Sequence, residues 1–234
     1  MRTYSNEDFI YIGKEAGNEI LSKIKNAKDS VKIVSPYLSA NYIQELITLH
    51  NQGRKITLIT SDNLVTGDRH YSSFNISDLV KKEKIQKPEA EKKGKVILKA
   101  CIPVFVLSFI LLIYGFSIFA VALLFICSVF IISYFPTKSY FYDYKTIFRI
   151  KVFDSKSGSN PRSTELIHSK IFLIDDETAF LGSANFTYSG FKKHYETVIK
   201  ITDKRAVKDI SEEVESLYNS NIAREKSIRE WSGL

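Results

Sequence analysis

The feature that most constrains the fold is a long stretch of the chain without charge. Residues 100–137 contain no Asp, Glu, Lys or Arg, and they are almost wholly apolar as far as Phe135. The 36 residues up to that position would extend about 54 Å as one helix, whereas the hydrocarbon core of a bilayer is roughly 30 Å thick. Tyr114 and Gly115 offer a turn near the middle. We therefore expect a transmembrane helical hairpin over residues 96–135.

Positive charge flanks this stretch on both sides. Two crossings keep the segments before and after the hairpin on one side of the membrane, as parts of one folded domain. The positive-inside rule places both flanks in the cytoplasm, so we expect a protein of the inner (cytoplasmic) membrane with two spans. The amino terminus shows no signal-peptide pattern. The flanking charges are Lys81, Lys82, Lys84, Lys87, Lys92, Lys93, Lys95 and Lys99 before the stretch, and Lys138, Lys145 and Arg149 after it.

The net charge of +7 is concentrated beside the apolar stretch. Residues 80–99 contain eight lysines and three glutamates, which gives +5, and the rest of the chain is nearly balanced. Attraction to anionic lipid headgroups explains such a cluster without nucleic acid. Both cysteines, Cys101 and Cys127, lie within the apolar stretch, so no disulfide framework is expected.

The segments on either side of the hairpin indicate an α/β domain. Ile20 and Ile24 lie at helical spacing before an apolar strand at 31–34, and a second helix and strand follow over residues 39–60. This order predicts a mixed β-sheet flanked by helices. Without the hairpin roughly 195 residues remain, enough for one domain but not for two repeats. The expected division is 1–62 for the N-terminal part of the domain, 63–95 for a Lys-rich linker, 96–135 for the hairpin and 140–234 for the C-terminal part.

The most specific chemistry lies in the C-terminal part. His168 and Lys170 are two residues apart at the start of an apolar strand, so their side chains project from the same face. A polar turn at 175–177 leads into a second apolar strand, and Ser183 and Asn185 follow it. Antiparallel strands joined by a short turn bring their outer ends together. We therefore expect all four side chains to converge on one spot.

These side chains suit chemistry on a phosphodiester. Imidazole can attack phosphorus and form a covalent intermediate. Lys170 supplies positive charge, and Ser183 and Asn185 supply hydrogen-bond donors for the non-bridging oxygens. This chemistry requires no metal or other cofactor. The remaining histidines show no metal-ligand spacing; they are His50, His70 and His194.

Written as H-x-K-x4-D-x6-G-S-x-N, these residues resemble the signature of the phospholipase D superfamily, with every fixed position filled. The resemblance implies that His168 is the nucleophile and forms a phosphohistidine, and that Lys170 and Asn185 bind the phosphate. It implies that Asp175, the acidic member of the catalytic motif, is a structural partner in ion pairs and hydrogen bonds near the site. Glu196, 28 residues after His168, matches the glutamate that supports the histidine in that family.

The chain holds one complete motif and no second Gly-Ser-x-Asn. Members of the family with one motif commonly pair two chains around a two-fold axis, so the resemblance implies a homodimer. In that arrangement His168 of one subunit attacks phosphorus, and His168 of the partner subunit protonates the leaving oxygen.

The resemblance leaves two classes of substrate open. Two membrane tethers near the lipid surface narrowly favour hydrolysis or transfer on a phospholipid. The alternative is a membrane-tethered endonuclease acting on DNA or RNA, since many compact single-motif members of the family are nucleases. A further alternative is an inactive protein that binds phosphodiesters or scaffolds a partner. Basic residues that could contact either substrate are Lys151, Lys156, Arg162, Lys192 and Lys193.

Overall fold

The computed structural model of the chain forms two compact units. It describes residues 2–3, 8–62, 76–134, 140–154, 167–222 and 224–233. The first unit comprises Met1–Lys81 and Tyr144–Leu234, and the second, Lys82–Asp143, is inserted into it along the chain. Several expectations lie outside the described residues: those for Lys156, Arg162, residues 63–75 and Phe135.

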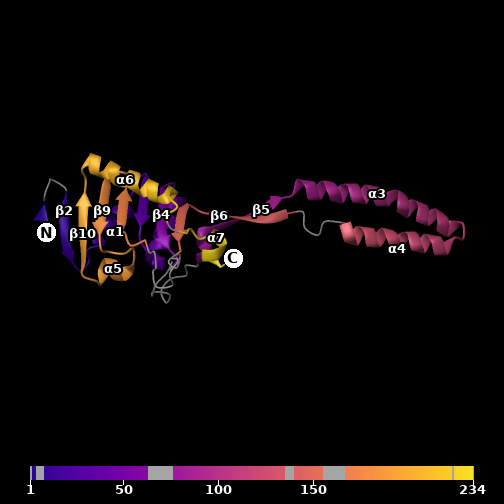
Figure 1. The fold of residues 1–234 in the computed structure, drawn as a ribbon, viewed down its shortest axis with the longest axis horizontal. Helices are drawn as coiled ribbons and strands as arrows, with labels where there is room; N and C mark the ends of the chain where they lie inside the picture. Colours follow the sequence, from indigo (N-terminus) through magenta and orange to yellow (C-terminus); the bar gives the residue numbers. More distant parts are fainter. Residues whose placement is uncertain are drawn as a thin grey trace. The chain divides into compact units, whose positions relative to one another are not determined.

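The first unit is built on an eight-stranded mixed sheet in the order β1-β2-β10-β9-β8-β3-β4-β7 (Figure 1). β4 runs parallel to β3 and β7, whereas the other neighbouring strands are antiparallel. The expected mixed sheet is confirmed. Its strands are β1 (Arg2–Thr3), β2 (Phe9–Gly13), β3 (Ser30–Val34), β4 (Lys55–Ser61), β7 (Arg149–Phe153), β8 (Ile171–Ile174), β9 (Thr178–Gly182) and β10 (Glu196–Ile201).

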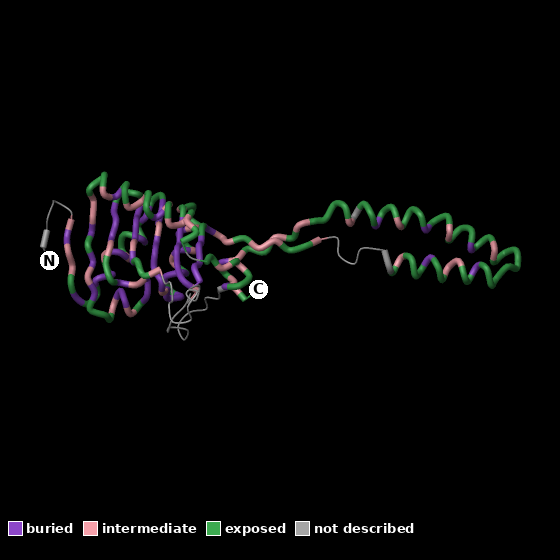
Figure 2. Tube along the Cα trace, viewed as in Figure 1, coloured by how far each residue is buried: buried purple, intermediate pink, exposed green. Residues whose placement is uncertain are grey.

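Helices cover both faces of this sheet, because successive side chains of a strand point to opposite sides. In β3, Ile33 belongs to a core cluster that includes Ile20 and Leu46 from helices on one face. The next residue, Val34, packs with Val214 of a helix on the other face. Figure 2 shows the buried strands between these layers. The helices of the first unit are α1 (Asn18–Lys25), α2 (Ala40–Asn51), the 3₁₀ helix η1 (Ile76–Leu79), α5 (Tyr188–Lys192), α6 (Lys204–Asn219) and α7 (Ile228–Ser232).

Local sequence sets the start and the buried stripe of α6. The Asp203 side chain accepts a hydrogen bond from the backbone N–H of Ala206 and so caps the first turn. Val207 and Val214 are seven residues apart, which places them on one side of the helix, and both are buried. These two residues of α6 are therefore part of the core.

The second unit contains a helical hairpin and most of a two-stranded ribbon. Helices α3 (Pro88–Ile113) and α4 (Ser117–Tyr134) are joined through a tight turn in which Gly115 has φ +84°. By length and composition α3 could cross a membrane, with a mean hydropathy of 2.7 over its most apolar window, and α4 is apolar but shorter. The ribbon pairs β5 (Val80–Gln86) with β6 (Tyr140–Thr146).

The structure corrects the expected linker over residues 63–95. Residues 80–86 form β5, and α3 begins at Pro88, eight residues before the expected hairpin. β5 is a lysine-rich strand without a regular apolar side, so its sequence alone did not predict a strand; pairing with the distant β6 stabilises it. Proline is well suited to the first turn of a helix because its missing N–H needs no partner there.

Candidate active site

A tight hairpin brings the two halves of the motif together. β8 and β9 are antiparallel, with Ile171 opposite Leu181, and the backbone N–H of Gly182 donates to the Lys170 carbonyl at 3.3 Å. The turn between the strands has Asp175 and Asp176 at φ 56° and 50°. Consecutive residues at positive φ match the twist of a short hairpin. The segment before β8 and the segment after β9 therefore meet at one edge of the sheet.

Gly182 allows β10 to approach this edge closely. A Cβ atom at this position would lie 2.0 Å from the carbonyl oxygen of Thr197, so only glycine fits without moving the backbone. β10 pairs with β9 here, with Val198 opposite Gly182. The close pairing places Glu196, at the start of β10, beside Ser183.

His168 and Lys170 are in direct contact at the sheet edge. The Nζ atom of Lys170 lies 2.9 Å from Nδ1 and 3.2 Å from Nε2 of His168, and it donates to the His168 carbonyl at 2.6 Å. His168 is exposed, whereas Lys170 is 6% exposed. Burial lowers the pKa of Lys170 below its ordinary value of 10.5, and the negative charge of Glu196 partly opposes this shift. An accessible imidazole thus lies against a largely buried ammonium group.

Glu196 contacts the serine of the motif and not the histidine. The Ser183 hydroxyl donates to Oε2 of Glu196 and accepts the backbone N–H of Thr197 at 3.0 Å. Oε1 of Glu196 lies 3.7 Å from Nδ1 of His194. Within the part of the chain that the structure describes, no hydrogen bond joins Glu196 to His168.

Two sequence-based expectations are corrected by this arrangement. A hydroxyl carries one proton, and that of Ser183 is donated to Glu196, so the serine does not offer a donor to a phosphate oxygen in this conformation. Glu196 was expected to support His168 directly. It is instead held by Ser183, and its negative charge acts on Lys170.

Asn185 lies in the loop that follows β9, and among the residues that the structure describes its buried side-chain oxygen has no hydrogen-bond partner. Two serines after β3 hold the backbone beside it. Ser35 Oγ accepts the N–H of Phe186, and Ser39 Oγ accepts the N–H of Tyr188, both at 2.9 Å. Neither contact was predicted from the sequence, in which Ser39 was only a candidate N-cap of the next helix. The signal that the sequence offers is two small polar residues within five positions of the end of a buried strand.

The amino-acid sequence matches the model of a known protein family. The family model described as "Cardiolipin synthase, PLD-like domain" matches residues 20–112 and 129–218. The chain belongs to the phospholipase D superfamily. Members of this superfamily are phosphodiesterases, among them nucleases, phospholipases and synthases. No curated protein sequence matches the chain.

Solved structures share the fold at low sequence identity. NucT from Helicobacter pylori is 15% identical with a TM-score of 0.52, over 93% of this chain and 99% of that one. Nuc from Salmonella typhimurium, a phospholipase D family member, is 14% identical with a TM-score of 0.46, over 94% and 99%. Phosphatidylserine synthase from Haemophilus influenzae is 13% identical with a TM-score of 0.44, over 94% and 39%. The likeness to NucT shows that the phospholipase D fold is shared.

Asp175 of the superfamily motif lies away from the motif histidine. It follows the far end of β8, five residues after Lys170, and a strand rises about 3.3 Å per residue. Its carboxylate accepts backbone N–H groups of Lys28, Asp29 and Ser30 at 2.8 to 3.1 Å. Asp175 was expected in the catalytic set, near the site. The structure places it at the opposite edge of the sheet, where it fixes the start of β3.

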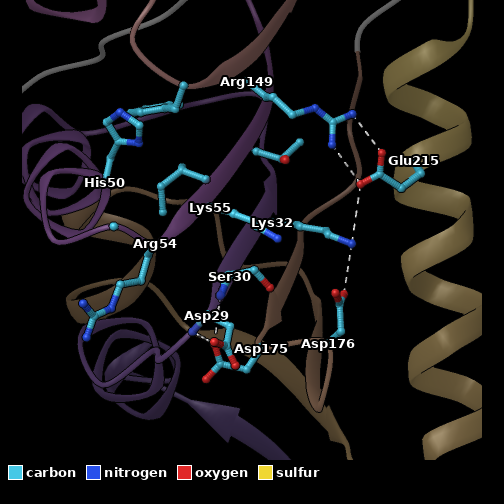
Figure 3. A pocket seen from close by; sticks show the side chains of 14 residues that line it. Asp29, Ser30, Lys32, His50, Arg54, Lys55, Arg149, Asp175, Asp176 and Glu215 are labelled. Atoms are coloured by element: carbon cyan, nitrogen blue, oxygen red, sulfur yellow. Dashed lines mark hydrogen bonds and ion pairs between the residues drawn. The ribbon is translucent and has the colours of Figure 1, made fainter.

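A cavity of about 610 Å³ lies at this opposite edge, and Figure 3 shows the side chains that line it. Its charged side chains pair largely with each other: Lys32 lies 3.0 Å from Asp176 and 3.5 Å from Glu215, and Arg149 forms two hydrogen bonds with Glu215. The pairing raises the pKa of Arg149 and lowers that of Glu215. The cavity contains Asp175 but no other motif residue, so we assign the candidate site to the His168 edge.

The structure also locates the basic residues expected to contact substrate. Lys151 lies in β7, is 4% exposed and donates to the carbonyls of Tyr218 and Ser220, so its ammonium group is engaged within the domain. Lys193 lies over the ring of Tyr188, 5.2 Å from its centre. Lys192 contacts the side chain of Asn18. Among the described residues, no cluster of three His, Cys, Asp or Glu side chains is arranged to hold a metal ion.

Proposed function

We propose that this protein is a membrane-anchored phosphodiesterase that hydrolyses or transfers a phosphodiester through a phosphohistidine, with a phospholipid as the favoured substrate. The observation that carries the proposal is the contact between His168 and Lys170, beside Ser183 and Glu196, at one edge of a phospholipase D fold. An exposed imidazole supplies the nucleophile, and the adjacent ammonium supplies the charge that a phosphoryl group requires.

The reaction proceeds in two displacements. A ring nitrogen of His168 attacks phosphorus with its lone pair, and the bond from phosphorus to the leaving oxygen breaks as that oxygen takes a proton from a general acid. Water, or an alcohol in transfer, then attacks phosphorus and gives up its proton to the same group, now a base, while the bond from phosphorus to the His168 nitrogen breaks and the imidazole is released. We assign the acid–base role to His168 of the partner subunit in a homodimer, because the chain has one motif.

Three other side chains prepare the site for this chemistry. Lys170 leaves the imidazole to bind the non-bridging oxygens when a phosphodiester enters, since one ammonium can donate to either. Asn185 contributes its amide N–H groups to the same oxygens. Ser183 orients Glu196, whose negative charge keeps the Lys170 ammonium protonated despite its burial.

Membrane anchorage is proposed from α3 and α4 together. α3 is long enough to span, and a hairpin with α4 returns the chain to the side on which it entered. The lysine-rich flanks support a cytoplasmic location for that side, by the positive-inside rule. A site tethered there meets phospholipids at high effective concentration, which is why a lipid phosphodiester is favoured over a nucleic acid.

The test is an assay of detergent-purified protein against labelled phospholipids and single-stranded DNA in parallel. His168→Ala should abolish turnover and the trapped phosphohistidine, whereas His50→Ala, in the cavity at the other edge of the sheet, should leave both intact. DNA cleavage without lipid turnover would identify a nuclease instead. Full activity in His168→Ala would refute the catalytic assignment altogether.

The homodimer has a separate test. Sedimentation and chemical cross-linking in detergent should show a dimer, and mixed dimers of wild-type and His168→Ala subunits should lack activity because each site needs both histidines. An active monomer would rule out the shared site while leaving His168 as the nucleophile.

A further inference from the structure

The β5–β6 ribbon of the second unit has two chemically different faces. Side chains alternate along a strand, so Lys82 and Lys84 share one face of β5, as Tyr140 and Tyr142 do in β6. Contacts show that this is one face of the ribbon. Lys82 Nζ lies 3.8 Å from the ring centre of Tyr142, and Lys84 Nζ lies 3.9 Å from that of Tyr140. We call these four residues the Lys–Tyr face.

The opposite face of the ribbon carries mixed charge. Both carboxylates of the two strands, Glu83 and Asp143, alternate onto it together with Lys81 and Lys145. Positive and negative charges therefore balance on that face. The Lys–Tyr face combines two cations and two phenols with no acidic residue, which is a distribution suited to an anionic partner.

We propose that the Lys–Tyr face binds the phosphate groups of anionic phospholipid headgroups. This inference rests on the membrane anchorage proposed above. Ammonium groups and phenolic hydroxyls both donate hydrogen bonds to phosphate oxygens, and Tyr and Lys are suited to the membrane–water interface. β5 ends at Gln86 and α3 begins at Pro88, so the ribbon adjoins along the chain the helix expected to enter the bilayer.

The geometry of the tyrosines favours lipid over nucleic acid. Proteins that bind single-stranded nucleic acid stack its bases on open aromatic faces. A lysine ammonium already lies over the rings of Tyr140 and Tyr142. What the surface presents is thus positive charge and hydroxyl groups, which match a phosphate headgroup and offer no platform for a base.

The test compares two double variants of the full-length, detergent-purified protein. Native mass spectrometry would give dissociation constants for short-chain phosphatidylglycerol and phosphatidylcholine. Lys82→Gln/Lys84→Gln should weaken phosphatidylglycerol binding about ten-fold or more, since each lysine near an anionic surface contributes roughly five-fold. The matched control Lys81→Gln/Lys145→Gln removes the same charge from the opposite face. It should change the dissociation constant for phosphatidylglycerol less than two-fold. Neither variant should alter phosphatidylcholine binding.

Three results would overturn the inference. Equal losses in the two double variants would mean that only total charge matters. Equal affinity of the wild type for the two lipids would mean that the face does not select anionic headgroups. Tighter binding of a 20-nucleotide single-stranded DNA, lost in Lys82→Gln/Lys84→Gln alone, would assign the face to nucleic acid.

Cleavage of a soluble phosphodiester shows whether a failed test refutes this inference or the proposed function. Both double variants should cleave bis(4-nitrophenyl) phosphate at the wild-type rate, because the ribbon contains no motif residue. Selective lipid binding in a protein with no His168-dependent cleavage would refute the proposed catalysis alone. His168-dependent cleavage without lipid selectivity would refute the Lys–Tyr face alone.

Discussion

The ammonium nitrogen of Lys170 lies 2.9 Å from Nδ1 of His168, so the cation and the proposed nucleophile of the candidate site are in direct contact. A buried ammonium that reaches the imidazole can also reach a phosphoryl group attached to it. The contact has a second consequence, because a lone pair that accepts from Lys170 cannot attack phosphorus. An entering phosphodiester must draw the lysine away and so release the nucleophile.

Replacing Lys170 by Gln should lower kcat/KM by about 10²- to 10³-fold, the range known for loss of one donor that stabilises a transition-state charge. The matched control is Lys200→Gln. Lys200 is also a buried lysine of the sheet, 8% exposed, but it pairs with Glu19 at 3.2 Å and not with the motif. Steady-state kinetics should show near wild-type kcat/KM for that variant, and similar losses in both would indicate a general effect of removing a buried charge.

The pH dependence of kcat/KM should depend on the ionisation of Lys170. Burial lowers the pKa of Lys170 below 10.5, and the site needs its protonated form, so kcat/KM should fall on the alkaline side at a lower pH than an ordinary lysine would give. Lys170→Arg keeps a group that stays protonated throughout this range. Its activity should be reduced but its alkaline limb should move to higher pH, and an unchanged limb would assign that ionisation to another group.

Ser183 should act through Glu196 and not on the phosphate. Ser183→Ala removes the hydroxyl that holds the carboxylate, and we expect kcat to fall about ten-fold with little change in KM. Because the two residues are in contact, the effects of Ser183→Ala and Glu196→Gln should not multiply in the double variant. Ser211→Ala, whose hydroxyl contacts Lys32 and Asp176 at the other edge, is the control. A rise in KM alone would restore Ser183 as a phosphate ligand.

Asp175→Asn should destabilise the protein without changing its catalytic activity. Burial tends to raise the pKa of this carboxyl, but hydrogen bonds from three backbone N–H groups outweigh it and hold the pKa below its ordinary value of 3.8. Hydrogen bonds to a charged group contribute about 1.5–3 kcal/mol, so the unfolding free energy should fall by about 2 kcal/mol at neutral pH. Asparagine is a suitable replacement because it tolerates positive φ.

The sign of the pH dependence follows from the lowered pKa. The ionised Asp175 carboxylate stabilises the fold fully above about pH 4, where this carboxyl is also ionised in the unfolded chain. The stabilisation is lost as the pH falls through the pKa of Asp175 in the folded protein, which is the lower of the two. Denaturant unfolding in detergent at several pH values should show wild type and Asp175→Asn converging in acid. The kcat of the folded variant should equal that of the wild type, and a loss of several hundred-fold would return Asp175 to the catalytic set.

The sequence predicted the elements whose patterns are local. The apolar strands on either side of Asp175 and the helix that carries Ile20 and Ile24 appear as expected. The hydrogen bond between the backbones of Gly182 and Lys170, which brings the two halves of the motif together, followed from a short hairpin, which leaves the chain few alternatives.

What the sequence did not predict depends on contacts between distant segments. The role of Ser35 depends on Phe186, 151 residues later, and that of Asp175 on the backbone of Ser30, 145 residues earlier. β5 likewise depends on β6 across the whole hairpin. Spacing within a motif carries no information about such partners, because each is brought into place by the sheet as a whole.

The two-span topology can be tested by cysteine accessibility. Tyr114, between α3 and α4, is 74% exposed, and the Lys208 side chain in α6 is 74% exposed. Single cysteines at these positions, in a background where Cys101 and Cys127 are changed to Ala, report the hairpin tip and the folded domain. A membrane-impermeant maleimide added to intact cells should label Tyr114→Cys and should label Lys208→Cys only after the membrane is permeabilised.

Each alternative topology gives a different labelling pattern, because the two positions lie on opposite sides only if α3 crosses and α4 returns. Lys208→Cys labelled in intact cells, with Tyr114→Cys protected, would mean the reverse orientation. Both protected until permeabilisation would mean that the hairpin does not cross, and the short loop of Tyr114 and Gly115 would then lie on the same side as the active site. A phospholipid substrate would still be reachable from a hairpin lying in the membrane interface, but the two-span topology would be wrong, and the positive-inside rule would have no spans to orient.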